Sequence, residues 1–197
     1  MKKALYILPI LVLCSFFGVQ DFVTTKVSSH LTMDLDAQLS SIPDEDSTAQ
    51  FKSNVATMAL YQSADEDANL SVKLFKESRD TLTKFKNRDA NKAKDRDLFL
   101  EKMFRKSSVI NQYDDVEFYQ DTLMDINGKQ TIVFEYTGTT SYKNQNDDIV
   151  QKKIYSYYQL MYSKNKTYII TFYCPEDRKS DWQSSAKTMM QSIKIRG

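Results

Sequence analysis

The sequence KTYIITFYCPEDRKSDWQSSAKTMMQSIKI spans residues 166–195 and combines two periodicities. Its first part, Thr167 to Cys174, is rich in aromatic and β-branched residues and stops at Pro175, a pattern typical of a strand. Its second part repeats large apolar residues every three or four positions, the spacing of one helix face. That stripe consists of Trp182, Ala186, Met189, Met190 and Ile193. The sequence therefore predicts a strand, a short loop and a C-terminal helix with one buried face.

The start of this helix carries polar residues that favour helix initiation. Ser180 is followed three residues later by Gln183, the spacing of a capping box. Asp181 lies in the expected first turn, where the helix dipole stabilises a negative charge. We therefore expect the helix to begin at Ser180.

Upstream of this region, Asn127-Gly128 is the strongest turn signal in the chain. It separates two strand-like segments, Glu117 to Ile126 and Lys129 to Thr137, and predicts an antiparallel hairpin. The tightest register gives both strands one apolar face. In that register the opposed pairs are Ile126 with Lys129, Leu123 with Ile132, and Tyr119 with Tyr136.

The remaining elements follow from simpler patterns. Three further segments have the composition of strands: Val55 to Gln62, Asn69 to Phe75, and Ile154 to Ser163. The last of these pairs with Thr167 to Cys174 in a second hairpin. Asp97 to Tyr113 is expected to be helical, because it repeats Leu100, Met103, Phe104 and Ile110 at helical spacing. Residues 79–96 are polar and fit either a solvated helix or a loop.

The end of the chain resembles the closing strand and helix of the PsbP-like family. The residues that carry this resemblance are Lys166 to Asp177, Asp181-Trp182, and the final Gln191-Ser192-Ile193-Lys194. The order of predicted elements is also similar, and the resemblance is strongest over 117–195. It implies an α+β fold in which one antiparallel sheet carries helices on both faces, an α/β/α sandwich. It implies no catalytic residues, because most members act by binding.

Residues 1–18 have the features of a secretory signal peptide. Met1-Lys2-Lys3 precedes an uncharged apolar run from Ala4 to Phe17, which is shorter than the ~20 residues of a membrane-spanning helix. Because Cys14 follows three apolar residues, a lipoprotein signal with a lipidated Cys14 is an alternative, as is an uncleaved anchor. We expect cleavage near Gly18, an extracytoplasmic protein, periplasmic or secreted, and a single domain over 19–197.

Charge is distributed unevenly along the chain. The segment from Lys73 to Lys106 contains twelve basic and six acidic residues. Without the leader, the whole chain has 25 basic and 26 acidic residues, so we expect no nucleic-acid partner. The basic segment fits either a solvated face or a patch for an acidic partner. The patch hypothesis assigns the partner contacts to Lys84, Lys86, Arg88 and Lys92.

The residue inventory argues against several chemistries. Two cysteines and the single histidine, His30, cannot form a Cys/His zinc site. Cys174 lies in an apolar strand, where we expect an inert buried thiol. Adjacent acidic residues are expected to be solvated turn residues, with weak Ca²⁺ binding as an alternative. These acidic groups are Asp44-Glu45-Asp46, Asp65-Glu66-Asp67, Asp114-Asp115 and Asp147-Asp148. We therefore expect no metal and no cofactor.

Three functional hypotheses remain. The first is a monomeric, non-catalytic binding or accessory protein of the bacterial cell envelope, with another envelope protein as its partner. The second is a carrier of a small apolar ligand, held between sheet and helix by Phe104, Tyr158 and Trp182. The third is a hydrolase with a pair of carboxylates. A cavity would favour the carrier, and carboxyl groups that converge in a cleft would favour the hydrolase.

Overall fold

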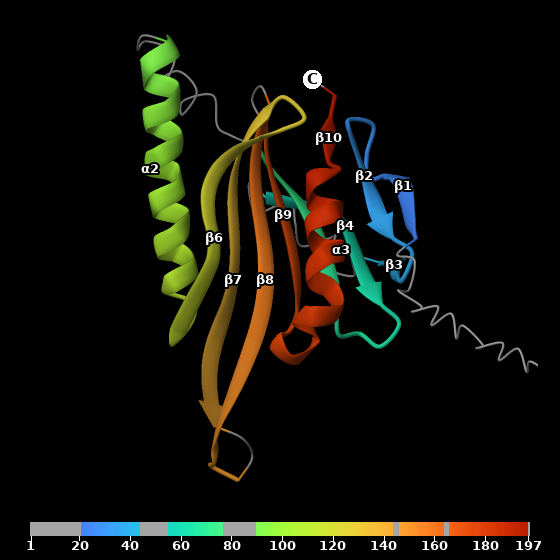
Figure 1. The fold of residues 1–197 in the computed structure, drawn as a ribbon, viewed down its shortest axis with the longest axis vertical. Coiled ribbons are helices and arrows are strands. Elements are labelled where there is room, and N and C mark those ends of the chain that lie inside the picture. The colour runs from blue at the N-terminus through green and yellow to red at the C-terminus, as the bar shows by residue number, and fades with distance from the viewer. Residues whose placement is uncertain (1–20, 44–54, 77–89, 144–145, 164–165, 197) are drawn as a thin grey trace, which may run out of the picture.

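The computed structural model describes residues 21–43, 55–76, 90–143, 146–163 and 166–196, with side chains of residues 90–97 excepted. Its centre is a seven-stranded antiparallel sheet in the order β3-β4-β5-β9-β8-β7-β6 (Figure 1). The strands are β3 (Leu39–Ile42), β4 (Val55–Ser63), β5 (Asn69–Lys76), β6 (Asp115–Ile126), β7 (Lys129–Lys143), β8 (Ile149–Ser163) and β9 (Lys166–Pro175).

Helices cover both faces of this sheet. On one face lie α3 (Lys179–Gln191), entered through the short helix η3 (Glu176–Arg178), and a small second sheet in the order β1-β2-β10. The small sheet contains β1 (Phe22–Lys26), β2 (Leu31–Asp36) and β10 (Lys194–Ile195). On the opposite face lies α2 (Ala90–Ile110), which runs along the β6 side of the molecule (Figure 1). The predicted α+β sandwich is confirmed.

The predicted strands and helices are present, with shifted ends. Each of the six predicted strands is observed, and β7 and β8 extend several residues beyond their predicted bounds. The helix expected over 97–113 begins earlier, at Ala90, and ends at Ile110. The small sheet was not predicted, because β10 has only two residues and pairs with β2 from the other end of the chain.

The first hairpin has the predicted turn but only part of the predicted register. Asn127 and Gly128 both adopt positive φ, 51° and 77°, as a tight hairpin turn requires. The Ile126–Lys129 and Leu123–Ile132 pairs are confirmed. The Tyr119–Tyr136 pair is wrong, because a β-bulge between Phe118 and Gln120 places Phe118 opposite Tyr136 instead. Tyr119 consequently leaves the face that Phe118 occupies, and its hydroxyl hydrogen-bonds Thr137.

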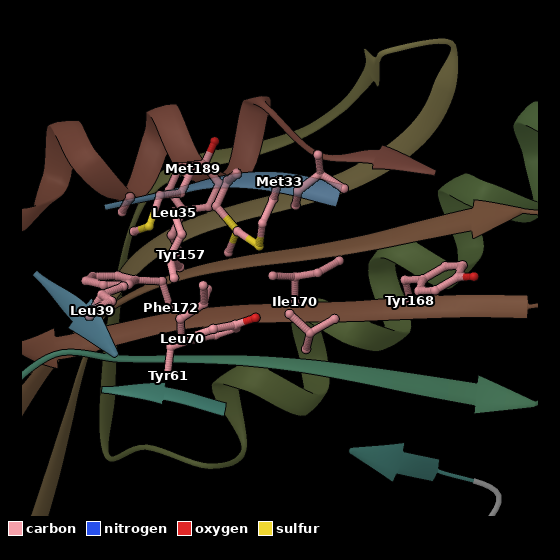
Figure 2. Close-up of a cluster of buried hydrophobic side chains, with 14 of the residues drawn as sticks. Met33, Leu35, Leu39, Tyr61, Leu70, Tyr157, Tyr168, Ile170, Phe172 and Met189 are labelled. Carbon is pink, nitrogen blue, oxygen red and sulfur yellow. The ribbon is translucent and has the colours of Figure 1, made fainter. Parts of the chain in front are cut away.

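The larger core lies between the sheet and the layer formed by α3 and β2. Figure 2 shows Met189 of α3 and Met33 and Leu35 of β2 above Tyr157, Ile170 and Phe172 of the sheet. The predicted apolar stripe of the C-terminal helix is buried throughout. Its largest member, Trp182, is only 2% exposed and lies 5.8 Å, centroid to centroid, from Phe172. The helix is therefore held in place by the residues that predicted it.

The predicted capping box is wrong. The N-cap residue is Arg178, which makes no side-chain cap hydrogen bond, and Ser180 already lies inside the helix. The preceding turn η3 leads directly into α3, so the chain enters the helix without the extended residue that a capping box needs. Asp181 does lie in the first turn, where Arg178 donates a 2.8 Å hydrogen bond to its carboxylate.

Two buried carboxylates link α3 to the strands beneath it. Glu135 of β7 is 1% exposed and accepts hydrogen bonds from Tyr155 and Gln183, and Lys187 lies 3.1 Å from it. Asp36 of β2 accepts a 2.6 Å hydrogen bond from Ser185. Buried carboxylates are costly unless they are paired, so these contacts fix the position of α3 on the sheet.

Candidate binding surfaces

Helix α2 turns a largely polar side toward the sheet. The ammonium groups of Lys102 and Lys106 lie 2.8 and 2.6 Å from the two carboxylate oxygens of Asp121 on β6. Lys106 also lies 4.7 Å above the ring of Phe118. Among the α2 side chains that the structure describes, Val109 is the one buried apolar residue. Ion pairs and a single turn of apolar packing therefore attach α2 to the sheet.

The opposite side of α2 exposes its large apolar side chains. Five of them are 46–70% exposed, and they occupy one side of the helix: Phe99, Leu100, Met103, Phe104 and Ile110. We call these five residues the α2 outer face. Leu100, Met103, Ser107 and Ile110 follow the alternating three- and four-residue spacing of a helix-packing seam. The helix is thus amphipathic, but its apolar side faces away from the core.

A groove of about 450 Å³ lies between α2 and the open part of the sheet. Its floor is formed by outward side chains of β7, β8 and β9, namely Tyr136, Ile154, Ser156, Tyr158, Ile169, Thr171 and Tyr173. The C-terminal end of α2 and the residues after it provide one wall, with Arg105, Ser108, Val109, Gln112 and Tyr113. Lys73 of β5 lies on the far side. We call this cavity the α2 groove.

One corner of the α2 groove depends on a glycine. The ring of Tyr113 lies so close to Gly138 of β7 that a Cβ atom at that position would be 2.5 Å from it. The same ring packs edge-on against Tyr136, with centroids 5.9 Å apart. Gly138 therefore allows the chain after α2 to fold down onto the sheet and form this end of the groove.

Two cations and several phenols line the α2 groove. Arg105 donates a 2.7 Å hydrogen bond from Nε to Glu101, while its terminal nitrogens make no hydrogen bond with the described residues. Lys73 likewise forms no ion pair with any described carboxylate. Burial raises the pKa of the Tyr158 phenol to about 12, and burial also raises that of Tyr136. The groove therefore offers positive charge and protonated hydroxyl groups.

The three residues predicted to form a ligand pocket do not come together. Tyr158 lies in the floor of the α2 groove, stacked on Phe134. Trp182 belongs to the core on the opposite face of the sheet. Phe104 is 70% exposed on the α2 outer face. The predicted pocket is therefore replaced by a groove that contains only Tyr158 of the three, because strand order and helix orientation separate the others.

The structure does not describe the side chains of the four residues assigned to a basic patch. Lys84, Lys86 and Arg88 fall outside the described residues. Lys92 is part of α2, but its side chain also falls outside them. The leader and Cys14 lie outside the described residues as well.

The structure also describes the histidine, the cysteine and some of the acidic residues that the sequence analysis considered. His30 is exposed in the turn between β1 and β2. Cys174 is fully buried, and burial raises the pKa of its thiol to about 12. Asp65 and Asp67 pair with Arg178 at 3.2 and 2.8 Å. Within the described ranges, no three His, Cys, Asp or Glu side chains are grouped to hold a metal ion.

Sequence reasoning missed Lys73 and Arg105 as members of one site. They are separated by more than thirty residues and lie on a strand and a helix whose adjacency depends on the sheet order. The available signal was the basic composition of the segment that contains both, which does not indicate where its side chains point. Among the helices of the described part, none is sufficiently long and apolar to cross a membrane.

Comparison with known proteins identifies the fold. The sequence matches no family model and no curated protein. The solution structure of cyanobacterial PsbP from Synechocystis is similar over 94% of this chain and 98% of that one, with a TM-score of 0.53 and 16% identity. The chain therefore has a PsbP-like fold, as the resemblance in its last 80 residues predicted.

Two further solved structures are similar over most of their length at lower scores. The Ran-binding protein Mog1p of Saccharomyces cerevisiae matches over 89% of this chain and 96% of that one, with 10% identity and a TM-score of 0.49. LpqN of Mycobacterium tuberculosis, involved in cell envelope biogenesis, matches over 90% and 91%, with 6% identity and a TM-score of 0.45.

Proposed function

We propose that this protein is an extracytoplasmic, non-catalytic binding module that engages a helix of another envelope protein through the α2 outer face. The observation that carries the proposal is the orientation of α2. Five large apolar side chains point outward, whereas two lysines of the same helix pair with Asp121 beneath it. Folding alone gives no reason to expose that side, because burial of apolar surface is what normally orients a helix.

The size of the α2 outer face fits a partner protein. Half-exposed side chains of this kind together leave on the order of 500 Å² of apolar surface. The largest apolar patch on a typical monomer is roughly 300–600 Å², and such patches are often functional. A specific interface covers roughly 800 Å² on each partner, so the face would form its apolar centre.

The seam on α2 favours a helix as the partner element. Leu100, Met103 and Ile110 present knobs at the spacing that a facing helix accepts in its holes. Ser107 is small and lies between Met103 and Ile110, which leaves room for a large side chain of the partner. A partner helix with large apolar residues at the same spacing would therefore fill the seam.

Charge favours a different protein over a second copy of this chain. Helix α2 contains six basic and three acidic residues, and it lies in the segment with twelve basic and six acidic residues. Two copies packed through α2 would bring together two helices that each carry an excess of three basic residues, which costs free energy and slows association even though Lys102 and Lys106 already pair with Asp121. A partner seam flanked by Asp and Glu would gain from the same charges.

The absence of a catalytic role and the location are parts of the same proposal. The raised pKa of the buried Cys174 thiol argues against a nucleophile there, and the described lining of the α2 groove contains no carboxylate pair. The signal-like sequence of residues 1–18 supports export from the cytoplasm.

Site-specific photo-crosslinking in intact cells tests the interface. The photoreactive residue p-benzoylphenylalanine replaces Phe104 in one strain and Tyr142, another exposed aromatic residue, on β7, in a control strain. We expect one major adduct from position 104, in which the cross-linked peptide of the partner is an acidic, apolar-periodic helix. Met103→Glu, and reversal of Lys84, Lys86, Arg88 and Lys92 to Glu, should each reduce that adduct at least tenfold.

Three results would overturn the proposal. One is an adduct of twice the mass of this chain, which identifies a second copy as the occupant. Another is an adduct with lipid in place of protein. The third is equal cross-linking from positions 104 and 142, which shows that the α2 outer face has no preferred partner.

A further inference from the structure

The α2 groove has the chemistry of a small-molecule site, and this feature is independent of the α2 outer face. Its volume of about 450 Å³ lies within the roughly 300–1,000 Å³ range of ligand sites in proteins. The floor is part of a well-packed sheet, where Tyr158 stacks on Phe134 with ring centroids 5.8 Å apart. Aromatic rings on a rigid floor favour a flat, apolar ligand body.

The charged groups of the groove favour an anionic ligand. Arg105 on α2 and Lys73 on β5 both line it, and the described lining contains no Asp or Glu. Glu101 occupies only Nε of Arg105, so the two terminal nitrogens remain to bind two oxygens of one carboxylate. Lys73 lies two strands across from Tyr158 and two residues further along, roughly 12 Å at ordinary strand and residue spacing, so its long side chain reaches the same ligand from the opposite side.

Hydroxyl groups provide the remaining polar contacts. Ser108, Ser156 and Thr171 line the groove beside the phenols. The Tyr158 hydroxyl is protonated at neutral pH, as in any tyrosine, and burial raises its pKa further, so it remains a hydrogen-bond donor. Glu101 takes up only Nε of Arg105, so the remaining donors and cations of the groove favour a negatively charged ligand.

We propose that the α2 groove binds a small aromatic carboxylate, with its carboxylate held by Arg105 and Lys73 and its ring on the part of the floor formed by Tyr158 and Tyr173. The ligand class follows from the pairing of cations with a flat aromatic floor. Such a ligand would touch the inner side of α2, whereas the proposed protein partner would touch its outer side.

Titration of the purified protein with 1-naphthoate tests this inference, and 1-naphthamide is the matched neutral probe. Isothermal titration calorimetry and two-dimensional NMR should show that 1-naphthoate binds at least tenfold more tightly than the amide. The backbone signals of Ser156 and Thr171 should shift, and those of Ala186 and Met189, on the far face of the sheet, should not. Affinity for 1-naphthoate should fall with added salt, because part of the attraction is between charges.

Substitutions assign the binding to these residues. Arg105→Gln and Lys73→Gln should each weaken 1-naphthoate binding at least tenfold, the usual cost of losing a charge-assisted hydrogen bond. Lys194→Gln, an exposed lysine of β10 on the other face, should bind as the parent protein does. Thermal unfolding checks that the variants fold, and Lys73→Gln keeps the test valid if loss of Arg105 destabilises α2.

The inference fails if 1-naphthoate and 1-naphthamide bind equally, because the cations then contribute nothing. It also fails if neither probe binds, if the shifted signals lie outside the α2 groove, or if folded Lys73→Gln binds as tightly as the parent protein. None of these results bears on the α2 outer face, so the two proposals are tested separately.

Discussion

Replacement of Trp182 by Ala should strongly destabilise the protein. Trp182 is 2% exposed in the larger core and packs on Phe172. Truncation of a buried Trp to Ala costs about 3–5 kcal/mol, from lost transfer free energy and from the cavity that remains. Because a domain is typically stable by only about 5–15 kcal/mol, this single change would remove much of its free energy of unfolding.

Two companion variants sharpen this prediction. Trp182→Phe keeps an aromatic ring on Phe172 and removes an indole N–H that has no hydrogen-bond partner, so it should cost less than about 1.5 kcal/mol. Phe104→Ala removes a side chain that is 70% exposed and should change the free energy of unfolding by at most about 0.5 kcal/mol. Loss of an aromatic residue would thus be costly in α3 and nearly neutral in α2.

Urea unfolding followed by far-ultraviolet circular dichroism measures all three variants. Tryptophan fluorescence is unsuitable, because Trp182 is the only tryptophan. A loss below about 1 kcal/mol for Trp182→Ala would refute the packing described for α3. A loss for Phe104→Ala as large as that for Trp182→Ala would show that the α2 outer face is part of a core.

Three further outcomes are expected. Gly138→Ala should cost about 1–3 kcal/mol in urea unfolding, because the new methyl group collides with the ring of Tyr113. Tyr113→Ala in the same chain should relieve that cost. If the parent and Gly138→Ala proteins are equally stable, the described contact is wrong. The free energy of unfolding should fall as pH rises from about 9 to 12. Burial raises the pKa of Cys174 and Tyr158 to about 12, so the unfolded chain releases these protons at lower pH than the folded chain does. A free energy of unfolding that stays constant over this range would contradict the burial of both groups. The intact mass of protein recovered from the cell envelope should lack residues 1–18, whereas a diacylglyceryl group on Cys14 or an unmodified full-length cytoplasmic chain would exclude simple cleavage.

Local sequence patterns predicted the elements whose signals lie within a few residues. Asn127-Gly128 predicted the turn because few residue pairs adopt two positive φ angles. The apolar stripe from Trp182 to Ile193 correctly predicted which side of the C-terminal helix is buried, since α3 packs on the sheet with its whole apolar side inward. Both signals are short-range, and the PsbP-like resemblance rested on the same part of the chain.

The same kind of pattern was insufficient for α2 and β6. The apolar spacing from Leu100 to Ile110 correctly indicates a helix, but the ion pairs with Asp121 orient it with that side outward. The bulge at Tyr119 places Phe118 opposite Tyr136, on the side that α2 covers and below Lys106, and alternation of residue types does not reveal such an irregularity.

The α2 groove was decided by tertiary structure alone. Lys73 and Arg105 approach the same cavity only because β5 pairs with β9, β9 pairs with β8, and α2 lies beside the strands that follow in the sheet. The sequence by itself determined the strand and helix segments, the first turn of the hairpins and the buried face of α3, since each depends on neighbouring residues. The sheet order, the orientation of α2 and the meeting of two distant cations depend on contacts between residues far apart in the chain, whose energies only the folded arrangement brings together.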